Sequence, residues 1–174
     1  AAKIRDKIET LLEAHYRETF EKWLETERIV CTPYFRLRPS IHPATYTDIY
    51  ARSLYAAEDG DMNKLEQKLV VELTALPNVR WWHRNIAKQD FAINGFIKHY
   101  PDILIMTKSG KLICAETKGD HLKNDNSREK IALGQAWRTA AGKDFRYYMV
   151  FENEENLLPG AMSMSQFIDT VKAL

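Results

Sequence analysis

Two acidic residues and a lysine stand at the ends of two neighbouring apolar runs in this sequence. Asp102 precedes the run ILIM, whereas Glu116 follows the run LICA and has Lys118 two residues after it. Burying a carboxylate costs several kcal/mol unless a cation or a hydrogen-bond donor accompanies it. A hard divalent cation stabilises two adjacent carboxylates, and Mg²⁺ held in this way also binds phosphate oxygens. The residue types therefore favour metal-assisted chemistry on a phosphate.

Whether the two acids meet depends on the turn that joins their strands. A three-residue loop at 108–110, with Gly110 in the left-handed conformation, is a favoured hairpin connection and places Asp102 opposite Glu116. Opposed side chains on one face have Cβ atoms roughly 5 Å apart. A two-residue loop at 109–110 would instead put the acids on opposite faces of the sheet. We predict the three-residue loop, because only that register gives both acids a common partner.

Two further side chains are expected at the same place. Lys118 lies one pleat beyond Glu116 on the same face, where its ammonium can contact a phosphate or hold an attacking water. Glu66 falls within the apolar face of a helix predicted over 62–76, so its side chain should point at the sheet. A carboxylate on such a face is either a salt-bridge partner or a metal ligand.

Each of these residues also has a purely structural interpretation. Asp102 can be a turn residue after Pro101, and Glu116 with Lys118 can form an ion pair on an exposed sheet edge. Glu66 can be an ordinary salt-bridge partner. The combination favours a site, because all four polar side chains fall on elements that would bring them together.

The pattern of apolar residues predicts the elements that hold these side chains. Helical spacing predicts helices over 3–27, over 62–76, from about 124 to 141, and over a short last segment capped by Ser163 or Ser165. Asn126 with Glu129 fits an N-cap and capping box for the third helix, and Gly142 ends it. Runs rich in aromatic and β-branched residues predict strands at 79–85, 102–107, 111–118 and 145–151, with a shorter strand at 91–95.

From residue 62 the predicted order is helix, three strands, helix, strand. The first strands can be antiparallel, and the last can pair in parallel after a helical crossover. We therefore expect an α/β (α+β) fold with a small mixed sheet flanked by helices. The break at 58–61 suggests an extension over 1–57, irregular from about residue 33, and a core domain over 58–174.

Composition sets the broad class. The chain has 174 residues, of which 45% are hydrophobic and 28% are charged, as in an ordinary globular domain. No apolar stretch is long enough to span a bilayer and no signal-peptide pattern opens the chain, so we expect a cytoplasmic protein without a membrane partner. Cys31 and Cys114 lack the spacing of a zinc site, and Cys114 is expected in the core. The chain begins without Met, so we expect a piece of a larger protein.

Charge is distributed unevenly along the chain. Residues 1–76 carry 11 basic and 13 acidic side chains, 77–151 carry 13 and 7, and 152–174 carry 1 and 4. The middle segment, with net charge +6, contains the candidate acids and suits an anionic partner, although a solvated surface explains the charge equally well. Residues that could contact nucleic-acid phosphates near the site are Arg84, Lys98, Lys123 and Lys130, with Gln135 reaching either substrate or solvent.

The residues carry a resemblance to a known superfamily. Pro101-Asp102 followed by Glu116-Thr117-Lys118, with Glu66 upstream, resembles the PD-(D/E)xK nucleases. More narrowly, four stretches resemble the C-terminal endonuclease region of type III restriction enzyme Res subunits, in which a nuclease is joined to a superfamily 2 helicase. These stretches are 53–67, 78–85, 93–112 and 116–125.

The resemblance implies a fold, a reaction and partners. The fold would be the restriction-endonuclease-like core in the order αβββαβ, and the reaction would be Mg²⁺-dependent cleavage of double-stranded DNA, with Mn²⁺ as a substitute. Asp102, Glu116, the Thr117 carbonyl and Glu66 would hold metal, and Lys118 would orient or activate water. The partners would be a superfamily 2 helicase or translocase region, for which the first helix is a connector, and a methylation and recognition subunit.

Two other functions remain open at this point. The chain could be a nuclease fold that only binds nucleic acid, or a module that docks another subunit, with the acids as structural ion pairs. The histidines have no metal-ligand spacing, so His83 and His99 are expected on the surface or in the core, with His121 nearest the site. Trp137 is expected in the core.

Overall fold

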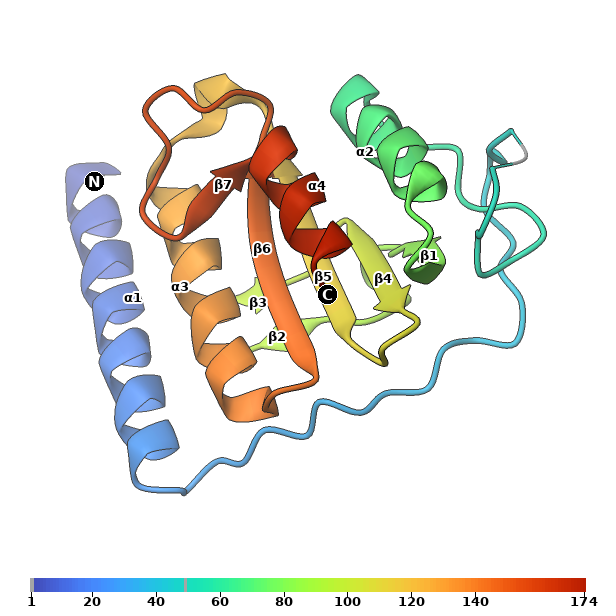
Figure 1. Cartoon of the computed structure of the whole chain (residues 1–174). Helices are drawn as coiled ribbons and strands as arrows, with labels where there is room; N and C mark the ends of the chain where they lie inside the picture. Colours follow the sequence, from blue (N-terminus) through green and yellow to red (C-terminus); the bar gives the residue numbers. More distant parts are fainter. Residues whose placement is uncertain (1, 49) are drawn as a thin grey trace.

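The structure is a computed structural model that describes residues 2–48 and 50–174 (Figure 1). The chain forms a mixed sheet with helices packed on it, which confirms the predicted α+β class. Along the chain the elements are α1 (Ala2–Glu25), α2 (Lys64–Ala75), β1 (Val79–Arg84), β2 (Ile93–Asn94), β3 (Lys98–His99), β4 (Ile103–Thr107), β5 (Leu112–Lys118), the 3₁₀ turn η1 (Asp120–Leu122), α3 (Asp125–Ala141), β6 (Phe145–Phe151), β7 (Ala161–Ser163) and α4 (Met164–Lys172).

The main sheet has the strand order β1-β4-β5-β6-β7. Strands β1, β4 and β5 are antiparallel, and β6 joins β5 in parallel after the crossover through α3, as predicted. The short strand predicted at 91–95 forms as β2, whereas two other short strands were not expected: β3, which pairs with β2 in a separate two-stranded sheet, and β7, which pairs in parallel with β6. Strands of two or three residues carry too little periodicity to be recognised in a sequence.

The hairpin between β4 and β5 has the predicted three-residue loop. The Thr107 N–H donates to the Lys111 carbonyl at 2.9 Å, and Gly110 adopts a φ of 84°. A positive φ is the reason that glycine suits this position. The register continues with Ile103 opposite Ala115, so the next pair along the hairpin is Asp102 and Glu116.

Two hydrophobic layers cover the two faces of the main sheet, so β4 and β5 are buried almost throughout. Helices α2 and α4 cover one face, where Leu69, Leu73 and Phe167 pack on Trp82, Ile105 and Val150. Helix α3 and the β2–β3 sheet cover the other, where Leu133, Trp137 and Ile93 pack with Leu104, Cys114 and Tyr147. The predictions that Cys114 and Trp137 are core residues are confirmed.

An asparagine is the N-cap residue of each of the two helices that flank the site. Asn63 caps α2 through a capping box in which its side chain accepts from the N–H of Glu66 and the Glu66 side chain accepts from the N–H of Asn63. Helix α3 begins at Asn124, whose side chain accepts from the N–H of Ser127. The prediction of Asn126 as the cap is wrong by two residues, because the NDNS sequence offers two asparagines and the turn η1 delivers the first of them.

The predicted N-terminal helix forms, but much of its apolar face is exposed. Phe20 packs on Phe96 with ring centroids 5.7 Å apart. Ahead of this contact, Ile4 is 67% exposed and Leu11 is 62% exposed. Within the residues that the structure describes, no helix is both long and apolar enough to cross a membrane.

The segment between α1 and α2 is extended and irregular, as predicted, and a buried cluster of charges attaches it to β1. The His83 ring contacts Glu58 at 2.6 Å through Nδ1 and Asp90 at 3.2 Å through Nε2. Asp90 also accepts from Nε of Arg38 at 2.8 Å. Burial lowers the pKa of His83, but the hydrogen bonds to Asp90 and Glu58 outweigh this effect and leave the pKa raised. We call these four residues the His83 cluster.

Candidate active site

Asp102 and Glu116 lie opposite each other where β4 begins and β5 nears its end. In an antiparallel pair, opposed positions alternate between hydrogen-bonded and non-hydrogen-bonded. The bond from Thr107 to Lys111 marks their pair as hydrogen-bonded, so the Asp102–Glu116 pair is of the other kind, in which the two chains come closer. The structure therefore brings the two predicted carboxylates together on one face of the hairpin.

One oxygen of Asp102 is occupied and the other is available. Oδ2 accepts from the backbone N–H of Thr117 at 2.8 Å and from its hydroxyl at 3.0 Å. Oδ1 has an ion-pair partner in Nη1 of Arg84 at 3.7 Å, which is beyond hydrogen-bond distance. Burial and the negative charge of Glu116 raise the pKa of Asp102 to about 6.

Glu116 is buried and its two oxygens differ in the same way. Oε1 accepts from Nζ of Lys118 at 2.8 Å and from Nζ of Lys130 at 2.7 Å. Oε2 is buried and has no hydrogen-bond partner among the residues that the structure describes. Nε2 of His99 lies 3.9 Å from it. A buried carboxylate oxygen without a donor is costly, so this atom marks a place where a ligand would be stabilising.

Glu66 reaches the cluster from the other layer, through Arg84. The Nη2 atom of Arg84 lies 3.4 Å from both carboxylate oxygens of Glu66, and its Nη1 atom donates to the Asp102 carbonyl at 2.9 Å. Burial, followed by the charge of Asp102, raises the pKa of Glu66 to about 7. The prediction that Glu66 points at the sheet is confirmed, since the residue is only 5% exposed.

The donor set fits a small divalent cation with few protein ligands. Oδ1 of Asp102 and Oε2 of Glu116 are the oxygens without hydrogen-bond donors. The residue that faces Thr117 in the continued register is Pro101, which has no N–H, so the Thr117 carbonyl receives no ladder bond from it. Among residues 2–48 and 50–174 no group of three or more His, Cys, Asp or Glu side chains is arranged to hold a metal ion. Two carboxylates and a carbonyl are nevertheless sufficient for Mg²⁺, which keeps several of its waters.

The other predicted residues divide into two groups. Lys118, Lys130 and Arg84 lie at the carboxylates, each engaged with one of them. Lys123 is instead held by Asp120 and the Glu155 carbonyl, and it lies 5.3 Å from the ring centroid of Phe151. The remaining two predicted residues do not contact the acids: Lys98, which lies on β3 over the ring of Tyr100, and Gln135, which lies on α3 near Gly160.

His99 lies at the site although its sequence position did not predict it. The expectation that His121 is the histidine nearest the site is wrong, because His99 lies beside Glu116 whereas His121 is exposed and packs against Gly119. His99 is 1% exposed, its Nε2 lies 3.0 Å from the Tyr147 hydroxyl, and burial with the charges of Lys130 and Lys118 lowers its pKa to about 3. His99 stands only three residues before Asp102 in the sequence, and this short separation could have indicated that it lies near the site.

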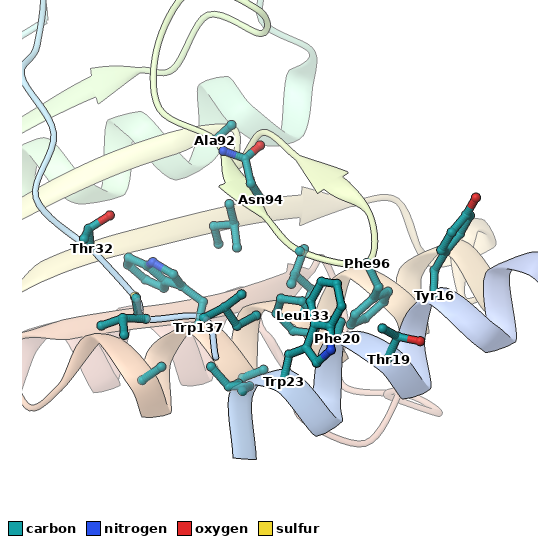
Figure 2. Close-up of a pocket in the computed structure, with 18 of the residues that line it drawn as sticks. Tyr16, Thr19, Phe20, Trp23, Thr32, Ala92, Asn94, Phe96, Leu133 and Trp137 are labelled. Carbon is teal, nitrogen blue, oxygen red and sulfur yellow. The ribbon is translucent and has the colours of Figure 1, made fainter. Parts of the chain in front are cut away.

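A large apolar cavity lies away from the carboxylates. A groove of about 1020 Å³ runs between α1, α3 and the β2–β3 sheet, with Phe20, Phe96, Leu133 and Trp137 among its lining residues (Figure 2). Its lining is mainly apolar and includes none of the four predicted catalytic residues. The groove is therefore a separate surface feature and not the pocket of the candidate site.

Comparisons with protein families, with curated proteins and with solved structures found no match for this chain. A function must accordingly be inferred from the geometry of the site.

Proposed function

We propose that this chain is a metal-dependent endonuclease domain that hydrolyses phosphodiester bonds in double-stranded DNA. The observation that carries the proposal is the opposition of Asp102 and Glu116 on one hairpin face, each with an oxygen that lacks a hydrogen-bond donor, and with Lys118 against Glu116. A module that only binds DNA gains nothing from carboxylates presented to phosphates, because like charges repel.

The residues present divide the work of hydrolysis between them. Asp102, Glu116 and the Thr117 carbonyl would hold Mg²⁺, which lowers the pKa of a bound water and neutralises charge on the phosphate. The Thr117 N–H and hydroxyl fix the rotamer of Asp102, which leaves Oδ1 directed away from them. Lys118 places an ammonium beside Glu116, where it can orient the attacking water and stabilise charge that develops on the phosphate.

Glu66 and Arg84 have a supporting role in this proposal. Arg84 bridges Glu66 to the Asp102 backbone, so it holds α2 against the start of β4. Glu66 would bind a metal ion only after its ion pair with Arg84 is broken and the metal ion takes the place of the guanidinium. In the setting that the sequence resemblance implies, the domain would be joined to a superfamily 2 helicase or translocase region and would act with a methylation and recognition subunit.

The test is a plasmid cleavage assay with Mg²⁺ or Mn²⁺, using the chain described here. We expect Asp102→Asn and Lys118→Met to reduce cleavage by at least about 100-fold, since each removes a group that acts on the reacting phosphate. A matched control is the exposed pair Lys111 and Asp144, whose ion pair of 2.7 Å lies at the far end of the sheet. Asp144→Asn should leave cleavage unchanged. Full activity of the Asp102 variant, or full activity in EDTA, would contradict the proposal.

A second candidate function is subunit docking, and the exposed apolar face of α1 favours it. This face includes Ile4, Ile8, Leu11 and Trp23, and it adjoins the groove between α1 and α3. Exposed apolar patches of this kind mark interaction sites. If docking is the whole function, Mn²⁺ will not raise the melting temperature, and Ile8→Lys will weaken association with the rest of the parent enzyme while DNA is never cut.

A further inference from the structure

A second cavity lies on the outer side of the β2–β3 sheet. Its volume is about 390 Å³, and it is lined by the segment 32–38 on one side and by residues between 88 and 100 on the other. In this sheet Ile93 pairs with His99 and Asn94 pairs with Lys98. These pairings determine which side chains lie on each face of the sheet. Ile93 and His99 are buried, so Asn94 and Lys98 face the opposite way, toward this cavity.

Three unpaired cations line this cavity. Arg36, Lys88 and Lys98 are exposed, and in the part of the chain that the structure describes none of the three is paired with a carboxylate. The ammonium of Lys98 lies over the ring of Tyr100, 5.4 Å from the ring centroid. Three like charges around one concavity repel one another, so an anion bound there would be stabilising.

The only acid among the lining residues is already neutralised. Asp90 accepts from Arg38 at 2.8 Å and contacts His83 at 3.2 Å, and its side chain is 1% exposed. Burial raises the pKa of Asp90, but hydrogen bonds from His83 and Arg38 outweigh this and lower it to about 2. The His83 cluster therefore fixes the two walls of the cavity relative to each other without offering a free negative charge.

We propose that this cavity binds phosphates of a nucleic-acid strand, through Arg36, Lys88 and Lys98. The inference rests on the proposed function in one respect, since its ligand is the DNA that the carboxylates would cut. Tyr100, which lines the cavity, is two residues from Asp102 in the sequence, so the cavity lies close to the candidate active site.

The arrangement of the cations favours a strand over a single small anion. A buried, single-anion site would be enclosed and rich in backbone donors, whereas these three side chains are exposed and come from different segments. A cavity of about 390 Å³ is larger than one phosphate and accommodates a phosphate with its flanking sugars. Separate cations then neutralise successive phosphates, which is how non-specific affinity for nucleic acid arises.

The experiment measures binding of a fluorescent 20-nucleotide DNA by anisotropy in EDTA, where no metal-dependent cleavage occurs. The triple variant Arg36→Gln, Lys88→Gln, Lys98→Gln is compared with Lys64→Gln, Lys108→Gln, Lys143→Gln. The control residues are exposed, lie outside the cavity and form no ion pair within the part of the chain that the structure describes, and both triples lose the same charge. Melting temperatures of both variants verify that the fold is intact.

We expect the cavity triple to weaken DNA binding by about tenfold or more and to lower the slope of log affinity against log salt by about 2 to 3. The control triple should change affinity by about twofold or less. Equal losses in the two triples would overturn the proposal, because only net charge would then matter. A competition experiment with ATP or pyrophosphate at millimolar concentration completes the test. If either compound displaces the DNA and binds the cavity as tightly as the DNA does, the cavity is a site for a free phosphate compound and the proposal is overturned.

The outcome is separable from that of the nuclease proposal. Binding in EDTA is measured without the metal ion and without cleavage, so it does not depend on the nuclease activity. Loss of binding in the cavity triple together with inactive wild-type protein would leave the phosphate site standing and reject the nuclease. Cleavage by wild-type protein with unaltered binding by the triple would do the reverse.

Discussion

The ammonium of Lys130, carried by α3, lies 2.7 Å from Oε1 of Glu116 on β5. Lys118 lies 2.8 Å from the same oxygen, so two cations share one buried carboxylate. Each ammonium neutralises part of the negative charge of Glu116 that would otherwise attract Mg²⁺. We therefore expect Lys130 to oppose the binding of a metal ion at the proposed site.

Replacing Lys130 by Met should strengthen metal binding. The change removes one positive charge from the carboxylate and leaves Lys118 in place, so Mn²⁺ affinity should rise about three- to tenfold, or about 0.7 to 1.4 kcal/mol. Titration calorimetry measures this, with Lys143→Met as a control for net charge. Weaker Mn²⁺ binding in the Lys130 variant would show that this ammonium supports the site and does not compete with the cation.

Asp102→Asn should stabilise the metal-free protein at pH 8. The pKa of Asp102 is raised to about 6, so its ionised form is disfavoured in the folded state; the resulting loss of stability begins above the unfolded pKa of about 3.9 and is complete above about pH 6. Asn keeps an oxygen for the Thr117 donors, and we expect the free energy of unfolding to rise by on the order of 1 to 2 kcal/mol. Mn²⁺ should then raise the melting temperature of the wild type but not that of the variant.

The control for this variant is Asp144→Asn. Its hydrogen bond with Lys111 lowers the pKa of Asp144, which is opposite in direction to the shift of Asp102. Removal of its charge should therefore give no stabilisation. A drop in stability for Asp102→Asn at pH 8 would mean that the two carboxylates are not in conflict.

The His83 cluster should make stability depend on pH in both directions. The raised pKa of His83 gives stability that is complete below its unfolded pKa of about 6.5 and is lost as pH rises through the folded pKa. The lowered pKa of Asp90 gives stability that is present above about pH 4 and is lost as pH falls toward about 2. His83→Gln should cost on the order of 2 to 3 kcal/mol at pH 6.

Chemical denaturation at pH 6 and pH 9 measures this effect. The difference in the free energy of unfolding between wild type and His83→Gln should shrink at the higher pH. Asp102 and Glu66 are present in both proteins, so their contributions cancel in this difference. His121→Gln serves as the control, since His121 is exposed. A difference that does not change with pH would exclude a charged His83.

Gly134 should not tolerate a side chain. A methyl group there would overlap the ring of Tyr147, which is fully buried and cannot move aside. We expect Gly134→Ala to destabilise the fold by about 1 to 3 kcal/mol, despite the better helix propensity of Ala. In a Tyr147→Ala background the same change should be neutral or stabilising. Equal losses in both backgrounds would show that the cost has another origin.

Local patterns in the sequence predicted the hairpin and the acids on it, since turn chemistry and period-two alternation act over a few residues. They left two loop lengths open, and the three-residue loop was preferred because only that register opposes Asp102 and Glu116. Helical periodicity likewise determined that Glu66 faces the sheet. These features depend on neighbours in the chain, which the sequence displays directly.

Only the tertiary structure decided which groups meet those acids. Lys130 arrives from α3, Arg84 from β1, and His99 from a two-residue strand that carries almost no periodic signal. The tertiary structure also decided that α1 leaves much of its apolar face exposed and that the His83 cluster joins Arg38 to β1. Such pairings are selected by close packing between distant segments, and packing is a property of the assembled layers that no stretch of a few residues contains.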